Sequence, residues 1–371
     1  MSFEIPEGTK DLLPAEVTLK NEIETKLHKQ LSSWGYRQVI TPSYEYLTTL
    51  AQGEESRLDY FSFISESGES IALRNDFTTP IARLANVALA EEPRPLRLYY
   101  LGNLFRLQRK ERKREFWQAG AELIGDGSPE ADAEILALAM SSLEAIGIPG
   151  WGLDIGHRGI LRGILNDSNL SIKSKQEVEN LFLNKDYAEL KALAKREKTC
   201  NDLLLLPDLR GDAKIINQAA KELSSPSAKI ALAEIEEILG ALSPYKINNI
   251  NIDLAMVKDL AYYSGMFFEG FAPGLAGVIC TGGRYDKLLG NFGKDEPAVG
   301  LAIGIDEVME VLAIKSNKCS EATPDLCIVY NQENYLKAIN IATEKRLKGE
   351  SVFIASDANR LPLAKEYLKL I

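Results

Sequence analysis

The hydrophobic and polar positions of residues 1–150 follow two periods, one typical of helices and one typical of strands. Apolar residues recur every four positions between 17 and 34, which predicts a helix that ends at Gly35. Alternating or continuous apolar runs predict strands over residues 36–40, 56–66, 70–74, 96–101 and 116–124, and Gly68 predicts a hairpin turn between the second and third of them. Two more helices are predicted over 79–90 and 128–146. The second starts with Ser128–Pro129–Glu130, residue types preferred at a helix N-terminus, and is followed by Gly147.

The second half of the chain changes its pattern twice. After a predicted strand over 151–157 the pattern is helical, which predicts a helical insertion at about 158–245 in a sheet-based domain of residues 1–314. The sheet resumes at 250–257, 278–279 and 300–303, and a helix starts near Asp306. A polar linker over 315–323 then leads to a truncated α/β tail, residues 324–371. Strand, helix, strand and helix are predicted in this tail over 325–330, 334–348, 351–355 and 361–370.

Composition and charge narrow the classes of function. The chain has 371 residues, 45% hydrophobic and 26% charged, which are ordinary values for a soluble protein of two or three domains. The net charge of −10 argues against nucleic-acid binding, because phosphate neutralisation dominates such binding. The four cysteines make no CxxC pair and stand beside two histidines, so we expect free thiols and no metal site. Without a basic, apolar leader or a long apolar run, the sequence predicts a cytoplasmic protein that spans no membrane.

The stretch from Cys280 to Glu307 carries the clearest signs of a ligand site. A strand-like approach leads into Gly282–Gly283, where missing side chains let the backbone pass close to a ligand. We therefore expect a small-molecule pocket built on a sheet. The end of the stretch, Asp306–Glu307, puts negative charge where a phosphate-binding pocket would need an arginine. The segment GNFGK, residues 290–294, lacks the spacing of a phosphate loop and is interpreted as a turn.

Two groups of residues are candidates for lining such a pocket. Gln118 and Glu122 lie four apart on one predicted strand, hence on one face, and Asp76 lies beside another strand. These polar residues form either an inward-facing site or the solvent face of an antiparallel strand. The tyrosines of the second group either close over a small polar ligand or fill the core. They are Tyr262, Tyr263 and Tyr285.

A basic segment lies between two predicted strands. Residues 106–114, RLQRKERKR, hold six basic residues and one acid. This segment either binds an anion, such as a nucleotide phosphate or RNA, or forms a solvated hairpin tip.

Taken together, these segments resemble the catalytic domain of histidyl-tRNA synthetases, a class II synthetase fold. The resemblance covers about residues 5–312. The matching motifs read IPEGTKDLLP, GYRQVITPSYEY (the dimer-forming motif 1), ALRNDFTTPIARL, LFR…REFWQAGAELIG (motif 2), LAYYSG…CTGGRYDKLLG and PAVGLAIGIDE. This resemblance implies an α+β fold, an antiparallel sheet flanked by helices, with an amino-acid pocket on one face. In the family an acid at the position of Asp76 holds the substrate ammonium. The residues implied to bind histidine are Asp76, Arg106, Gln118, Glu122, Lys258, Tyr262, Tyr263 and Tyr285.

The departures from the family concern the ATP site. The arginine of motif 3 that grips the ATP phosphates is Glu307 here, and a close charge pair is worth on the order of 4 kcal/mol. The second family arginine is Lys258, which keeps the charge without the bidentate fork, and the acid of motif 2 is Gln108. The tail is shorter than an anticodon-binding domain of roughly 100 residues. The resemblance therefore implies that histidine binding is kept and ATP binding is lost.

This combination is similar to the regulatory subunits of ATP phosphoribosyltransferases, a family of synthetase paralogues. That resemblance implies a non-catalytic homodimer without a cofactor, which joins a short catalytic subunit in a hetero-oligomer for the first step of histidine biosynthesis. It also implies histidine as the feedback effector. Two other functions stay open: a histidyl-tRNA synthetase or histidine-adenylating paralogue, and an RNA-binding module that uses residues 106–114.

Overall fold

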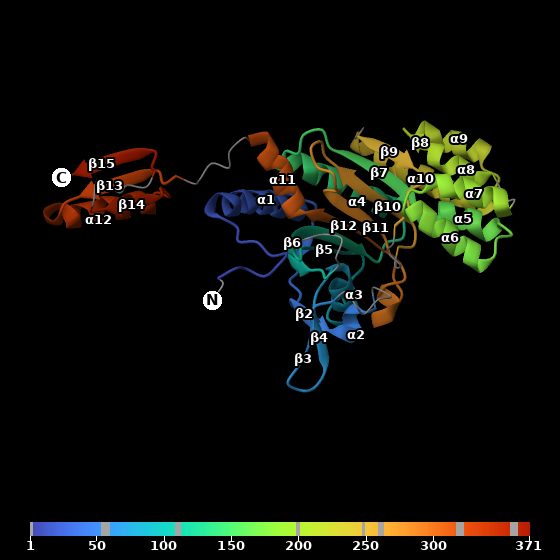
Figure 1. Ribbon diagram of the computed structural model, residues 1–371. Coiled ribbons are helices and arrows are strands. Elements are labelled where there is room, and N and C mark those ends of the chain that lie inside the picture. Colours follow the sequence, from blue (N-terminus) through green and yellow to red (C-terminus); the bar gives the residue numbers. More distant parts are fainter. Residues whose placement is uncertain are drawn as a thin grey trace. The chain divides into compact units, whose positions relative to one another are not determined.

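The structure is a computed structural model, in which two compact units can be described separately (Figure 1). It describes residues 3–52, 60–107, 113–197, 201–246, 249–258, 263–316, 323–356 and 363–371, without the side chains of 315 and 316. One unit holds Met1–Lys10 and Glu22–Lys315, and the other holds Asp11–Asn21 and Ser316–Ile371.

A large sheet forms the centre of the first unit. In the described part of the chain it has nine strands, in the order β1-β5-β6-β12-β11-β10-β7-β9-β8 (Figure 1). Neighbouring strands are antiparallel except for two parallel pairs, β1 with β5 and β7 with β9. The bounds are β1 Arg37–Gln38, β5 Leu96–Phe105, β6 Glu115–Ile124, β7 Gly152–His157, β8 Arg210–Gly211, β9 Ile250–Asp253, β10 Met266–Phe271, β11 Cys280–Arg284 and β12 Ala298–Gly304. The predicted antiparallel sheet flanked by helices is thereby confirmed.

The sheet differs from the prediction around its paired glycines. Gly282 and Gly283 lie inside β11, not after a strand, because β10 and β12 pair with them on both sides. Strand β10 was not predicted, and β9 ends at Asp253, four residues earlier than expected. The neighbouring strands supply a hydrogen-bond ladder that the glycine pattern by itself does not reveal.

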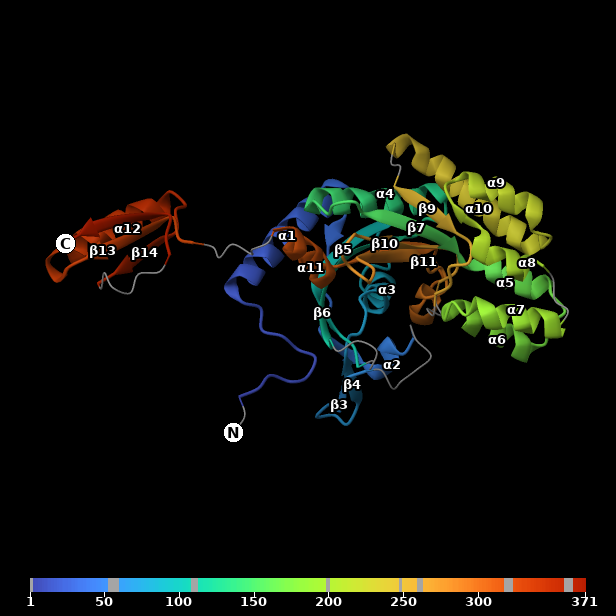
Figure 2. The same ribbon diagram turned by 45° about the horizontal axis from the view of Figure 1, so that its top comes forward.

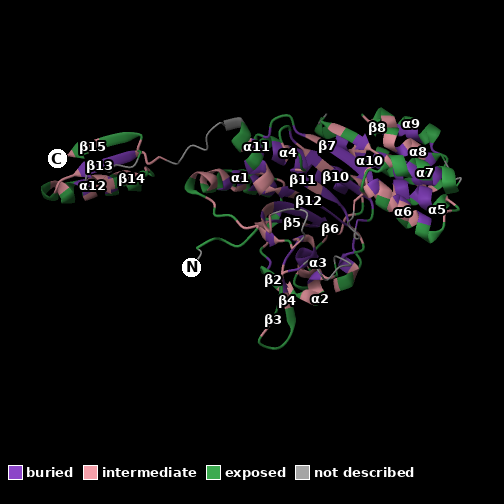
Figure 3. Cartoon of the chain, viewed as in Figure 1, coloured by how far each residue is buried: buried purple, intermediate pink, exposed green. Residues whose placement is uncertain are grey.

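Helices cover both faces of this sheet. On one face lie α4 (Pro129–Ile146) and residues 22–33 of α1 (Pro14–Ser33), and on the other lies α3 (Thr78–Val87). Alternate residues of β5 point to the two faces: the Tyr99 hydroxyl bonds to His28 of α1 at 2.6 Å, whereas Tyr100 stacks on Phe77, the residue before α3. Figure 3 shows that α4 and the middle strands of the large sheet are largely buried.

Helix α4 begins and ends as predicted. Ser128 caps it by accepting a hydrogen bond from the backbone N–H of Ala131, Pro129 is its first residue, and Gly147 follows in the left-handed conformation at φ 90°. Apolar residues occupy all sides of its middle, because α4 lies between the sheet and helix α10 (Pro226–Leu242).

A second, smaller sheet of the first unit has three strands in the described residues. Its order is β2-β4-β3, with β2 Tyr44–Tyr46, β3 Ser62–Ile64 and β4 Ser70–Leu73, and the short α2 is Leu47–Leu50. Strands β3 and β4 form the predicted hairpin, and Gly68 turns it at φ 83°.

The predicted helical insertion forms a group of helices at one end of the large sheet (Figures 1 and 2). Its helices are α5 Arg158–Asp167, α6 Ile172–Leu183, α7 Tyr187–Glu197, α8 Asp202–Leu205, α9 Lys214–Glu222 and α10 Pro226–Leu242, with 3₁₀ turns at Leu206–Asp208 and Ser243–Tyr245. The two-residue strand β8 interrupts them and attaches the insertion to the sheet edge through β9.

Two further elements follow the insertion in the first unit. A 3₁₀ turn, Leu289–Phe292, occupies the GNFGK region, so the interpretation as a turn is confirmed. Helix α11 is Ile305–Ser316. Cys280 and Cys327 are free and buried, as expected, and the other two cysteines lie outside the described residues. None of the described helices has the length and apolarity that a membrane crossing requires.

The second unit corrects one prediction. The central strand β13 (Leu326–Tyr330) is parallel to β14 (Val352–Ala355) and β15 (Glu366–Leu370), and α12 is Tyr335–Leu347, after a 3₁₀ turn at Gln332–Asn334. The predicted helix over 361–370 is wrong, since residues 366–370 form a strand. The segment forms a strand because the buried strand β13 requires a hydrogen-bonded partner at each edge. Leu368 and Leu370 alternate with residues that point outward, and they pack on the side of the sheet that α12 covers.

Candidate functional site

A polar cluster lies on the α3 face of the large sheet. Gln118, Gly120 and Glu122 of β6 face this side, in register with β5 and β12. The prediction that Gln118 and Glu122 share a face is confirmed, and the solvent-face alternative is wrong for Glu122, whose exposed fraction is 1%. We define the polar cluster as Asp76, Tyr100, Arg106, Gln118, Glu122, Tyr263 and Tyr285.

Glu122 is the centre of the cluster. Its Oε1 accepts a hydrogen bond from the Thr78 hydroxyl at 3.1 Å, and its Oε2 accepts one from the Tyr285 hydroxyl at 2.5 Å. Gly300, opposite on β12, makes room for the carboxyl group: a Cβ there would lie 1.8 Å from Oε2. Burial raises the pKa of Glu122 to about 8, against the lowering effect of the two hydrogen bonds.

Two of the three candidate tyrosines, Tyr263 and Tyr285, are described by the structure, and each is buried and belongs to the polar cluster. Tyr285 is 2% exposed and bonds to Glu122, so it serves the core and the polar cluster together. Tyr263 lies over Gly283, where a Cβ would be 2.8 Å from its ring, and stacks on Phe267 with centroids 5.9 Å apart. Burial, then the charges of Glu122 and Glu269, raise the pKa of Tyr263. Tyr262 lies outside the described residues.

Asp76 and Arg106 bring opposite charges to the cluster. The Asp76 carboxylate accepts hydrogen bonds from the backbone N–H (3.0 Å) and the hydroxyl (3.1 Å) of Thr79 at the start of α3. Burial raises the pKa of Asp76, and the Thr79 bonds and the charge of Arg106 lower it. Arg106 is exposed, donates to the Asn75 carbonyl at 3.2 Å and lies over the Phe116 ring.

Sequence reasoning missed Tyr100, which joins the members of the cluster. Its hydroxyl donates to Gln118 Oε1 at 3.3 Å and lies 2.3 Å from where a Cβ on Gly120 would be. Burial, then the charges of Glu122 and Asp76, raise the pKa of Tyr100, so these groups are close to one another. In the sequence, Gly120 lies between Gln118 and Glu122 on one face of the strand, and a glycine at such a position indicates that a large side chain from a neighbouring strand lies over it. That this side chain is Tyr100 follows only from the pairing of β5 with β6.

Lys258 lies near the polar cluster on the same face of the sheet, where it pairs with Glu269, an acid that the sequence analysis did not identify. Its ammonium pairs with Glu269 of β10, and both side chains are about four-fifths buried. Because the charge of Glu269 acts on Tyr263, Lys258 lies next to the polar cluster. Of the eight residues implied to bind histidine, six therefore belong to the cluster, Lys258 neighbours it and Tyr262 is not described.

Negative charge borders the Gln118 end of the cluster. Asp306 accepts a hydrogen bond from the Trp117 N–H at 2.7 Å and pairs with Lys113 at 3.0 Å. The Glu307 carboxylate lies over Gly304, which is opposite Gln118, at 1.9 Å from where a Cβ would be. Asp306 thus stabilises the chain where β12 ends, and Glu307 lies beside the polar cluster.

The described residues of the basic segment, 106, 107, 113 and 114, follow β5 and precede β6. The Arg106 N–H donates to the Arg114 carbonyl at 2.9 Å, and the Arg114 N–H donates to the Gly8 carbonyl at 2.7 Å. Arg114 also pairs with Glu7 at 3.9 Å. Residues 108–112, which include Gln108, lie outside the described residues.

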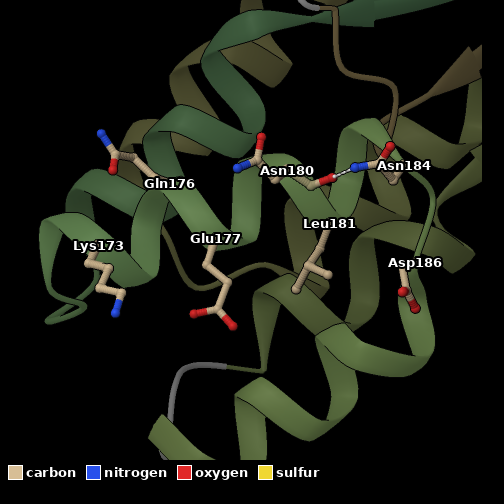
Figure 4. Close-up of a pocket in the computed structure, with 7 residues that line it drawn as sticks. All are labelled: Lys173, Gln176, Glu177, Asn180, Leu181, Asn184 and Asp186. Carbon is tan, nitrogen blue, oxygen red and sulfur yellow. Dashed lines mark hydrogen bonds between the residues drawn. The ribbon is translucent and has the colours of Figure 1, made fainter.

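A hollow on the insertion is unrelated to this cluster (Figure 4). It has a volume of about 510 Å³, and most of the residues that line it are polar and exposed. The lining residues are Lys173, Gln176, Glu177, Asn180, Leu181, Asn184 and Asp186. Since its polar side chains stand on the helix surface without a buried charge, we place the candidate site at the polar cluster.

The cluster is suited to a small molecule rich in N–H groups. Carboxyl and phenol oxygens accept hydrogen bonds from ammonium and imidazole groups, and Arg106 supplies a cation for a carboxylate. Among the described residues there is no group of three or more His, Cys, Asp or Glu side chains that could hold a metal ion.

Comparison with known proteins identifies the class first. The pattern of the histidyl-tRNA synthetase family matches residues 8–308. A histidyl-tRNA synthetase structure from Nostoc sp. PCC 7120 has the same fold, with a TM-score of 0.80 and 22% identity over 97% of this chain and 88% of that one. The fold is thus that of the histidyl-tRNA synthetase class.

Relatives with higher identity define the family more closely. ATP phosphoribosyltransferase regulatory subunits of Desulforamulus reducens and Bacillus subtilis are each 33% identical, over 94% and 95% of this chain and 88% and 91% of theirs. A solved ATP phosphoribosyltransferase regulatory subunit/histidyl-tRNA synthetase from Bacillus halodurans C matches with a TM-score of 0.91 and 30% identity, over 100% of this chain and 98% of that one. The chain belongs to the family of ATP phosphoribosyltransferase regulatory subunits, within the histidyl-tRNA synthetase class.

Proposed function

We propose that the chain is a non-catalytic regulatory subunit of an ATP phosphoribosyltransferase, needed in the cytoplasm for the first step of histidine biosynthesis. The names of the relatives support this role. The observation that carries the loss of catalysis is Glu307 beside Gln118, where the synthetase class requires a cation for the ATP phosphates. A carboxylate there repels a triphosphate.

We propose further that free histidine binds in the polar cluster as the feedback effector. Asp76 holds the ammonium group, Arg106 the carboxylate, and Glu122 with Tyr263 the imidazole. Gln118, Lys258, Tyr262 and Tyr285 complete the site. For histidine to inhibit, its affinity must differ between the active and the inhibited assembly.

The assembly that follows from this proposal has two kinds of contact. Residues 1–314 bind the effector and form a homodimer through the motif 1 segment, and the short catalytic subunit joins this dimer. The exposed side chains of Tyr44, Tyr46 and Phe63 on one face of the small sheet support a second copy as their partner, because their exposed fractions are 55%, 50% and 47%. The linker 315–323 and the tail 324–371 form a separate part.

An ATP–pyrophosphate exchange assay with histidine tests the loss of catalysis. We expect no exchange above a protein-free control, together with calorimetric binding of histidine to the same preparation. Exchange that depends on both histidine and ATP would contradict the proposal and establish the alternative, a histidyl-tRNA synthetase or a histidine-adenylating paralogue. The match of residues 8–308 to the synthetase family favours that alternative.

A further inference from the structure

The segment Tyr263–Gly265 carries Tyr263 into the polar cluster and is held on both sides. Ser264 donates its backbone N–H to the Arg284 carbonyl at 2.8 Å and its hydroxyl to Asp286 at 2.9 Å. The Asp286 N–H in turn donates to the Ser264 hydroxyl oxygen at 3.0 Å. Asp286 also accepts from the Ala298 N–H at 3.0 Å, which ties the segment to β12.

The helical insertion contacts the same segment directly. The N–H of Arg158, the first residue of α5, donates to the Gly265 carbonyl at 3.0 Å. Gly265 also packs closely: a Cβ there would lie 3.4 Å from Arg284 and 3.6 Å from His157. Gly265, two residues after Tyr263, is therefore bonded directly to the start of α5.

Polar side chains extend from this segment to the last helix of the insertion in two hydrogen-bonded groups, one around Arg284 and one around His157. The two groups meet where Gly265 packs against both side chains, and we call them together the polar network. Arg284 bonds to Asp132 of α4 at 3.0 Å and to Asp286 at 3.1 Å. His157 accepts the Gly159 N–H on Nδ1 at 3.0 Å, so its ring proton is on Nε2, which donates to Glu234 of α10 at 2.9 Å.

Three members of this network are buried. Exposed fractions are 7% for Arg284, 5% for Asp132 and 6% for His157. Buried charged groups that lose a partner pay a large desolvation cost, so the network keeps one geometry or rearranges as a whole. Glu234 is the member at the surface, with 52% of its side chain exposed.

We propose that Ser264, Asp286 and Arg284 are positioning residues for the effector site, and that they couple it to the helical insertion through Arg158, His157 and Glu234. A shift of the insertion would move Tyr263 relative to Glu122, and a ligand that fixes Tyr263 would fix the insertion in return. This inference rests on the proposed function, because the effector is taken to be histidine.

Two variants test the coupling at opposite ends of the network. Ser264→Ala removes the hydroxyl next to the site, and Glu234→Ala removes the acceptor of His157 in the insertion. Neither side chain belongs to the polar cluster. We expect each variant to weaken histidine binding about 3- to 10-fold by calorimetry, the loss of about one hydrogen bond. Glu234→Gln, which keeps an acceptor, should restore most of the affinity. Glu237→Ala, exposed on the same helix, is the matched control and should bind like the wild type.

Hydrogen exchange gives a readout that needs no ligand. In the Glu234→Ala chain we expect the amides of residues 263–265 to exchange severalfold faster than in the wild type and in Glu237→Ala. Faster exchange supports the coupling even if the wild-type chain does not bind histidine, a result that would contradict the effector proposal instead. Unchanged exchange at 263–265, or wild-type histidine affinity in both Ser264→Ala and Glu234→Ala, would overturn the coupling.

Discussion

At the scale of single residues, the site depends on glycines that leave room for polar side chains. Glu122 occupies the space above Gly300, Tyr263 the space above Gly283 and Tyr100 the space above Gly120. Alternation along β6 was sufficient to predict that Gln118 and Glu122 share a face. The hydroxyls of Tyr100 and Thr78 were not predictable, because the partners of a side chain depend on the strand pairing and on where α3 lies.

Gly300→Ala tests this dependence. The new Cβ would lie 1.8 Å from Glu122 Oε2 and 2.9 Å from the Ala121 carbonyl, so Glu122 must move. We expect a loss of about 1–3 kcal/mol in the free energy of unfolding and a fall in histidine affinity of more than about tenfold. Denaturant unfolding and calorimetry measure both. Gly240→Ala is the control: nothing lies within 4 Å of its Cβ, and the helix gains up to about 1 kcal/mol. Unchanged histidine binding in Gly300→Ala would contradict the account.

Glu122 also predicts a pH dependence. Its pKa is raised from 4.5 to about 8 in the folded chain because the group is buried, so the folded state binds the proton more tightly than the unfolded state. The stability from this group is fully present below the unfolded pKa and is lost as the pH rises through about 8.

Glu122→Gln removes this loss and should destroy the effector site. At high pH we expect the variant to be more stable than the wild type by a few kcal/mol, at about 1.4 kcal/mol for each pKa unit, and the difference should vanish near pH 4. Histidine binding should fall by more than about tenfold. Urea unfolding of both chains across this pH range measures the difference in the free energy of unfolding. A difference that does not change with pH would contradict a raised pKa of Glu122.

At the scale of elements, the sequence was sufficient to predict those helices and strand pairs whose ends are marked by cap or turn residues. Ser128, Pro129 and Gly147 marked both ends of α4, and Gly68 marked the β3–β4 turn. Strand β15 was mistaken for a helix, because the apolar residues in 361–370 fit either period and the demand of β13 for a second partner is not a local property. Strand β10 was missed for the same reason: it is defined by its neighbours β7 and β11.

Ser128→Ala measures how much the cap contributes to α4. The hydroxyl accepts the Ala131 N–H, and we expect its loss to lower the free energy of unfolding by about 1 kcal/mol. Ser141→Ala is the matched change in the same helix, since the Ser141 hydroxyl donates to the Leu138 carbonyl and caps nothing. It should be neutral or slightly stabilising. Equal effects of the two substitutions in thermal or urea unfolding would show that the cap is unimportant.

At the scale of the whole molecule, the proposed homodimer predicts a surface effect. Tyr44→Asp with Phe63→Asp places charge on the exposed face of the small sheet, where the two rings contact each other with centroids 6.2 Å apart. We expect this double variant to be monomeric by light scattering at concentrations at which the wild type is dimeric. Ile230→Asp, at a residue of α10 with an exposed fraction of 64%, is the control and should leave the dimer intact. A dimeric double variant would move the interface elsewhere.

The role as a regulatory subunit is tested most directly by reconstitution. The short catalytic subunit of ATP phosphoribosyltransferase from the same organism is assayed with and without this chain, and with and without histidine. We predict that the chain raises the activity at least about tenfold and that histidine removes the gain. The Glu122→Gln chain should stimulate without the response to histidine. A catalytic subunit whose activity is unchanged by this chain, with no complex in solution, would contradict the account.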